Sequence, residues 1–148
     1  MQNFTAELVD ATNHRKNLVK MADLLVLDMP CSGLGTLRRK ADIKLRKQAG
    51  DMQALAQISR EIIEASWQYV KPGGKMLFST CTISKSENLD NFSWILDNLP
   101  FDAVDFSANL PDFLNYPTAK NGYMQILPQD FGGDGFFVGV LQRRVENG

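Results

Sequence analysis

The stretch LLVLDMPCSGLG (Leu24–Gly35) decides how this chain folds. It opens as an unbroken apolar run, which is typical of a parallel β-strand covered on both faces, and then passes into Asp-Met-Pro-Cys. A second stretch, KMLFSTC, has the same form and ends at Cys81. The sequence therefore predicts strands over residues 23–27 and 75–79, each with a cysteine just beyond its carboxyl end.

The segment between these two strands has a helical pattern over residues 51–70. Apolar side chains recur there at steps of three and four residues, as they do on one face of a helix: Leu55, Ile58, Ile62, Ala65 and Tyr69. The Lys-Pro-Gly-Gly at 71–74 is expected to end this helix. A strand–helix–strand unit makes its two strands parallel neighbours. We therefore expect Cys31 and Cys81 on the same rim of the sheet, where α/β proteins bind their ligands.

The other segments complete an α/β pattern. A short strand is predicted over residues 4–9. Ser84 and Glu87 match a capping box at the start of a helix that runs to about residue 99. Further strands are predicted over 101–106, 123–127 and 135–141, and the last two flank a polar turn that favours an antiparallel hairpin. The predicted fold is a parallel sheet with a C-terminal antiparallel hairpin.

Composition excludes several classes of protein. The 148 residues suit one domain, and no apolar run approaches the roughly 20 residues that would span a bilayer. The first ten residues lack the pattern of a signal peptide, so we expect a cytoplasmic protein. In that compartment free thiols are favoured over a disulfide. One histidine and two distant cysteines do not make a zinc site, so we expect no metal.

The net charge of −1 means that any contact with nucleic acid depends on a local patch. A cationic run follows the first cysteine motif and would place positive charge beside the thiol rim. Such runs are most often solvated surface, and next to a reactive rim this one becomes a candidate phosphate-contact surface. Its candidate RNA-binding residues are Arg38, Arg39, Lys40 and Lys44.

Thiolates attack soft electrophilic carbon once they are deprotonated or activated. One target is carbon 6 of a pyrimidine ring, because attack there makes carbon 5 able to accept a methyl group from a sulfonium donor. This chemistry needs a nucleophilic cysteine, an acid, a base and a methyl donor. Asp28, three residues before Cys31, is suitably placed for the acid or hydrogen-bonding role.

The motif DMPCSGLG, followed fifty residues later by STCT, resembles the RsmB/Sun family of RNA cytosine-5 methyltransferases. The stretches RRKADIK and ILPQDFGGDGFFVGVLQR are similar to that family too, so the resemblance covers nearly the whole chain. It implies a Rossmann-like methyltransferase fold and S-adenosylmethionine as the methyl donor. It also implies RNA, in particular small-subunit ribosomal RNA, as the partner. In this resemblance Cys81 is the nucleophile and Cys31 assists product release. Asp28 contacts the donor or the cytosine, and Asp10 contacts the adenosine of the donor.

The sequence lacks the glycine-rich turn and first strands with which the family's catalytic domain begins. The resemblance therefore implies that residues 1–148 are the C-terminal portion of a class I methyltransferase catalytic domain. We expect weak donor binding and no activity from the isolated chain. Without its neighbour, the strand at 23–27 would be an open apolar edge, which favours self-association.

Two other classes remain open. A thiol-redox protein would use the cysteine pair directly, but the chain has no Cys-x-x-Cys, and a disulfide would need the two Cα atoms within about 7 Å. A non-catalytic RNA-binding module would keep the fold without the chemistry. The presence of both cysteine motifs favours catalysis by the parent enzyme, while the chain alone could still behave as a binding module.

Overall fold

The structure is a computed structural model that describes residues 3–37 and 49–145. Its strands are β1 (Ala22–Asp28), β2 (Val70–Thr80), β3 (Phe101–Ala103), β4 (Tyr123–Ile126) and β5 (Phe136–Arg143). Its α-helices are α2 (Ala49–Ser66), α3 (Leu89–Asn98) and α4 (Pro128–Phe131). Short 3-10 helices are η1 (Lys16–Leu18), η2 (Leu34–Thr36), η3 (Trp67–Tyr69), η4 (Ser107–Asn109) and η5 (Pro117–Asn121). In the part of the chain described, no helix combines the length and the apolarity needed to cross a membrane.

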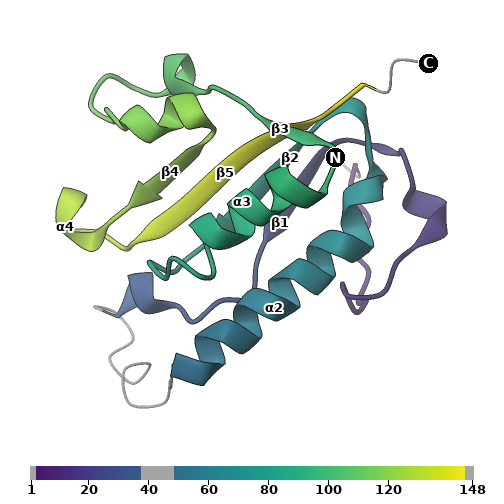
Figure 1. The fold of residues 1–148 in the computed structure, drawn as a ribbon, viewed down its shortest axis with the longest axis horizontal. Coiled ribbons are helices and arrows are strands. Elements are labelled where there is room, and N and C mark those ends of the chain that lie inside the picture. Colours follow the sequence, from purple (N-terminus) through teal and green to yellow (C-terminus); the bar gives the residue numbers. More distant parts are fainter. Residues whose placement is uncertain (1–2, 38–48, 146–148) are drawn as a thin grey trace.

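The strands form one mixed sheet in the order β1-β2-β5-β3, and β4 also pairs with β5 (Figure 1). β1 and β2 are parallel neighbours, as predicted, with Asp28 opposite Ser79. β4 and β5 form the predicted antiparallel pair. The sheet is not parallel throughout, because β5 lies between β2 and β3 and runs antiparallel to both.

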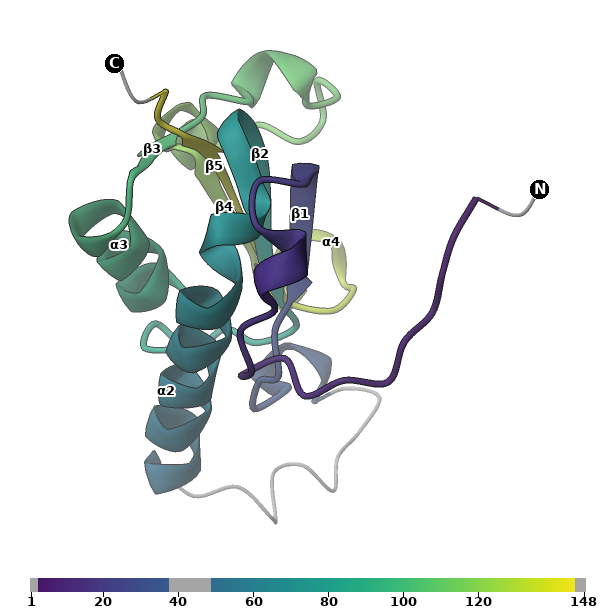
Figure 2. The same cartoon turned by 90° about the vertical axis from the view of Figure 1, so that its right-hand side faces the viewer.

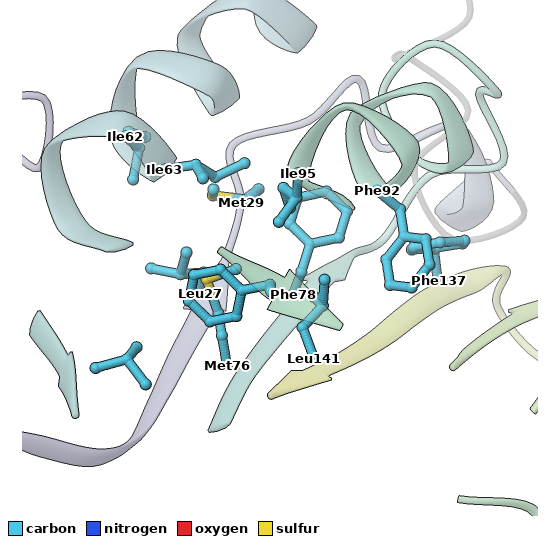
Figure 3. Packing of buried hydrophobic residues seen from close by; sticks show 12 residues of the cluster. Leu27, Met29, Ile62, Ile63, Met76, Phe78, Phe92, Ile95, Phe137 and Leu141 are labelled. Atoms are coloured by element: carbon cyan, nitrogen blue, oxygen red, sulfur yellow. The ribbon is translucent and has the colours of Figure 1, made fainter. Parts of the chain in front are cut away.

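Helices α2 and α3 cover the same face of the sheet (Figure 2). Beneath them, aromatic and aliphatic side chains from β2, β5 and both helices form the core (Figure 3). Phe78 and Phe137 meet edge to face, with ring centroids 5.9 Å apart, and Phe92 packs against Phe137. Each such buried side chain contributes about 1.5–3 kcal/mol relative to an exposed one, so this layer fixes the sheet that carries the cysteines.

β1 is the edge strand that the sequence predicts, but it is not covered on both faces. Leu25 and Leu27 face the core, whereas Leu24 and Val26 are 56% and 57% exposed. The unbroken apolar run therefore reflects a strand with one buried and one open face. Apolar character alone cannot separate these two cases, because it does not show what lies against the second face.

The predicted strand over residues 4–9 is wrong. Residues 3–10 have no regular structure, and their side chains are exposed. Figure 2 shows this segment extending away from the sheet. A strand needs a hydrogen-bonded neighbour, and among the described strands none pairs with residues 3–10.

The predicted end of the first helix also needs correction. α2 ends at Ser66, η3 follows, and the Lys-Pro-Gly-Gly segment lies inside β2. Gly73 has a left-handed φ of 79°, and the β1–β2 register shifts between Ala22 and Leu24. The glycine accommodates this irregularity in the strand, which is a recognised use of glycine in sheets.

Candidate active site

The two cysteines meet at the carboxyl ends of β1 and β2. Cys31 follows β1 by three residues and Cys81 directly follows β2. Because Asp28 and Ser79 are partners in the parallel ladder, the two loops leave the sheet side by side. The Sγ atoms are 3.2 Å apart, and both thiols are free. The prediction that the cysteines share one rim is confirmed.

The two thiols are half-buried, and they share one hydrogen bond. Burial, and to a smaller extent the hydrogen bond with Cys81, raises the pKa of the Cys31 thiol to about 11. At neutral pH Cys31 therefore keeps its proton and can donate it in a hydrogen bond to the Cys81 sulfur.

A buried carboxylate joins the two cysteine loops. Glu87 is fully buried, and its carboxylate accepts hydrogen bonds from the Ser32 N–H and the Ser32 hydroxyl, each at 2.7 Å. Thr82 lies 2.8 Å from the Ser32 hydroxyl and 3.5 Å from the carboxylate. Glu87 is therefore not the capping-box residue predicted from sequence, since its side chain reaches across to the neighbouring loop.

Asn88, the residue after Glu87, holds the turn that carries Cys81 from both sides. The Thr80 hydroxyl donates to the Asn88 side-chain oxygen at 2.6 Å, and the Asn88 amide donates to the Thr82 carbonyl at 2.9 Å. The same amide donates to Gln125 of β4 at 2.8 Å. Asn88 is also the N-cap of α3, so Ser84 is not the cap.

Backbone contacts complete the site. The Gly35 N–H donates to the Cys81 carbonyl at 3.1 Å, and the Gly135 N–H donates to the Gly35 carbonyl at 2.8 Å. A Cβ atom on Gly35 would lie 2.2 Å from the Gly135 carbonyl oxygen, so only glycine fits. The loop after β1 is thus fastened both to the loop after β2 and to the turn before β5.

Comparison with known proteins gives this arrangement a family. The family model for the 16S rRNA methyltransferases RsmB/F matches residues 1–142. This chain belongs to the RsmB/F methyltransferase family. The matched residues include both cysteine loops and the strand that begins in the DGFF sequence.

An individual member of the family agrees with this assignment, and two solved structures share the fold. The chain is 38% identical, over 82% of its length, to the ribosomal RNA small subunit methyltransferase B of Vibrio cholerae, of which it spans 26%. The crystal structure of PH0851 matches with a TM-score of 0.75 and 32% identity, over 84% of this chain and 27% of that one. The crystal structure of NSun6 from Pyrococcus horikoshii with SFG matches 96% of this chain and 35% of that one, with a TM-score of 0.73 at 22% identity. This RsmB/F chain thus spans about a quarter of the length of the curated relative.

The two aspartates predicted for this RsmB/F chain differ in their placement. Asp28 ends β1 beside the thiol loops, with an exposed carboxylate that accepts from the Ser79 hydroxyl at 3.2 Å. Asp10 lies in the exposed segment before η1, where Thr12 donates its N–H and hydroxyl to it and these bonds lower its pKa. Within the described residues, no hydrogen bond joins Asp10 to the thiol loops.

The described residues therefore fit only part of a binding site for the methyl donor. An exposed carboxylate at the end of β1 is suited to a cationic or hydroxyl-bearing ligand, while Asp10 belongs to a separate segment. The RNA-binding residues predicted from the cationic run, Arg38, Arg39, Lys40 and Lys44, lie outside the described residues. The described part of this RsmB/F chain contains no cluster of three or more metal-ligating side chains.

Proposed function

We propose that this chain carries the thiol half of an active site that methylates carbon 5 of a cytosine in small-subunit ribosomal RNA, with S-adenosylmethionine as the methyl donor. The chain spans about a quarter of its curated relative and holds both thiols. The observation that carries the proposal is the pair of free thiols 3.2 Å apart at the ends of two parallel strands. Family membership supports RNA as the substrate.

Cys81 is the proposed nucleophile. Its sulfur forms a bond to carbon 6 of the cytosine, and the displaced electron pair makes carbon 5 reactive. S-Adenosylmethionine, when bound, supplies the methyl group that carbon 5 accepts. A general base then accepts the proton from carbon 5, the electron pair of that C–H bond restores the ring double bond, and the bond to sulfur breaks so that Cys81 leaves as a thiolate. The raised pKa of Cys31 supports this division of labour, since a thiol that holds its proton is a poor nucleophile at neutral pH.

Cys31 has the release role in this proposal. It lies against the sulfur that must leave, and its proton can stabilise that sulfur as the thiolate forms. Asp28 is proposed to contact the donor or the cytosine from the end of β1. Asp10 is proposed to contact the adenosine of the donor, and the cationic residues at 38, 39, 40 and 44 to contact RNA phosphates.

An adduct experiment tests the assignment of the nucleophile. Because the chain spans a quarter of its relative, we would test it both alone and grafted in place of the matching segment of the Vibrio cholerae relative. Each protein is incubated with S-adenosylmethionine and ribosomal RNA containing 5-azacytosine, and the covalent adduct is detected on a denaturing gel. Cys81→Ser is expected to abolish the adduct and lower methyl transfer at least about a thousandfold. Cys31→Ser is expected to retain it.

The other outcomes have definite meanings. An adduct that is lost in Cys31→Ser and kept in Cys81→Ser would assign the nucleophile to Cys31 instead. RNA binding without any adduct, in a graft that is folded by circular dichroism, would contradict the catalytic proposal and favour a binding module. If the graft forms an adduct and the isolated chain does not, the chain needs the rest of the relative's sequence for the reaction.

A further inference from the structure

One buried charged group has no part in the reaction just described. Glu87 is fully buried, and burial of a carboxylate is costly unless donors surround it. Its donors are the N–H and the hydroxyl of Ser32, each at 2.7 Å, and the Thr82 oxygen lies 3.5 Å from the carboxylate. A carboxylate that accepts several such bonds holds its donors firmly, because charge-assisted hydrogen bonds are stronger than neutral ones.

The identity of these donors points to a role. Ser32 directly follows Cys31, and Thr82 directly follows Cys81. Because the Ser32 hydroxyl donates to Glu87, its 2.8 Å contact with Thr82 is a bond that Thr82 donates. The Thr82 hydroxyl thus donates to Ser32, and Ser32 donates to the carboxylate, so this chain of hydrogen bonds links the residues next to both thiols.

The neighbouring residue fixes the second loop independently of the first. Asn88 binds Thr80 and Thr82, the residues on either side of Cys81, while Glu87 binds the residue after Cys31. Glu87 and Asn88 therefore act, just before α3, on the loop after β1 and on the end of β2 with the loop that follows it. A simple helix cap would bond the first turn of its own helix, whereas the Glu87 carboxylate bonds a loop that is 55 residues away in sequence.

We propose that Glu87 is a positioning residue that holds the Cys31 loop against the Cys81 loop and so sets the separation of the two thiols. Its importance for catalysis rests on the proposed function, in which both sulfur atoms act on the same cytosine. A shift of the Cys31 loop would leave Cys81 able to attack but would remove the partner that assists its departure. Geometry of this kind has to be held closely for catalysis, and buried supporting hydrogen bonds provide that restraint.

A dithiol probe tests the positioning without RNA or donor. Phenylarsine oxide binds two thiols that are held next to each other, and the full 148-residue chain is expected to bind one molecule. Glu87→Ala is expected to weaken that binding at least tenfold. Glu87→Gln, which keeps an acceptor for the Ser32 N–H, should fall between the two. Binding is measured by calorimetry and by protection of the thiols from alkylation.

Two controls separate positioning from loss of stability. Glu64→Gln removes an exposed carboxylate from α2 and should leave arsenical binding unchanged. Val70→Ala lowers stability at the far end of β2 and should also leave it unchanged while the chain stays folded. If Glu87→Ala binds the arsenical as tightly as the wild type, or if the wild type does not bind it, the proposal is wrong.

The adduct assay gives the catalytic readout. For this readout the RNA contains ordinary cytosine, from which the enzyme can be released. In the graft, Glu87→Gln is expected to let the adduct form and to slow its release, so that adduct accumulates as in Cys31→Ser. Equal losses of adduct formation and release would contradict the positioning role. If no variant forms an adduct while the arsenical result holds, the proposed function fails and the positioning of the thiols stands.

Discussion

Gly35 lies where the Cys31 loop touches two other segments. Its N–H binds the Cys81 carbonyl, and its own carbonyl receives the N–H of Gly135. A Cβ atom at this position would approach the oxygens of Gly135 and Cys81 to 2.2 Å and 2.8 Å. These neighbours are backbone atoms, so they cannot turn away as a flexible side chain would.

Gly35→Ala is therefore expected to lower the free energy of unfolding by about 1–3 kcal/mol, as overpacking of a tight contact does. It should also weaken binding of phenylarsine oxide, since the Cys31 loop must move. Urea denaturation measures the first effect. Gly133→Ala is the matched control, because a Cβ there would meet nothing within 4 Å. Equal effects of the two substitutions would contradict the contact argument.

Sequence locates some residues of the site and misses others for a physical reason. Cys31 and Cys81 could be placed on one rim, because strand ends and a single crossover determine where they lie. Glu87 could not, because its partner Ser32 is distant in sequence and a Ser-x-x-Glu spacing is equally consistent with a local cap. Asn88 and Gln125 carry no sequence signal either, since their bonds depend on how α3 and β4 pack.

At the scale of an element, α2 shows the limit of periodicity. The pattern correctly predicts a helix, but it places Ile58 on the buried face, where the structure leaves it 39% exposed. Ile63, which was not in the predicted stripe, is fully buried between the helix and the sheet (Figure 3). Periodicity defines a stripe within about one residue, whereas the crossing of helix and sheet decides which edge of that stripe faces the core.

Ile63→Ala is expected to lower the free energy of unfolding by about 2–5 kcal/mol, because it leaves a cavity in the core. Ile58→Ala removes the same atoms from the same helix and should cost less than about 1 kcal/mol, as exposed positions do. Both free energies of unfolding are measured by urea denaturation and fitted with a common m-value. A cost for Ile58→Ala that matches the cost for Ile63→Ala would mean that α2 packs through a different face.

The whole molecule presents an open side at β1. Leu24 and Val26 project from it, and β1 has a strand neighbour on one side only among the described residues. An exposed strand edge of this kind offers unpaired backbone groups to a second copy of the chain. The sheet order itself could be predicted only in part, because the position of β5 between β2 and β3 depends on pairings remote in sequence.

We expect the chain to self-associate through β1 at tens of micromolar. Val26→Lys should return it to a monomer, since a lysine at a strand edge opposes pairing. Sedimentation velocity measures the change. Phe113→Lys is the control, because Phe113 is 73% exposed and lies outside the sheet. A monomeric wild-type chain, or equal effects of both lysines, would contradict the role of β1.

The central place of β5 has a consequence for how the protein is made. β2, β3 and β4 each pair with β5, so none of those three pairings can form before residues 136–143 have left the ribosome. Until then, among the strand pairings of residues 3–37 and 49–145, the β1–β2 pair alone can form, and the Gly135 contact with the Cys31 loop is absent. During translation, the contacts between the two thiol loops can therefore form before those that join the loops to β5 and the turn before it.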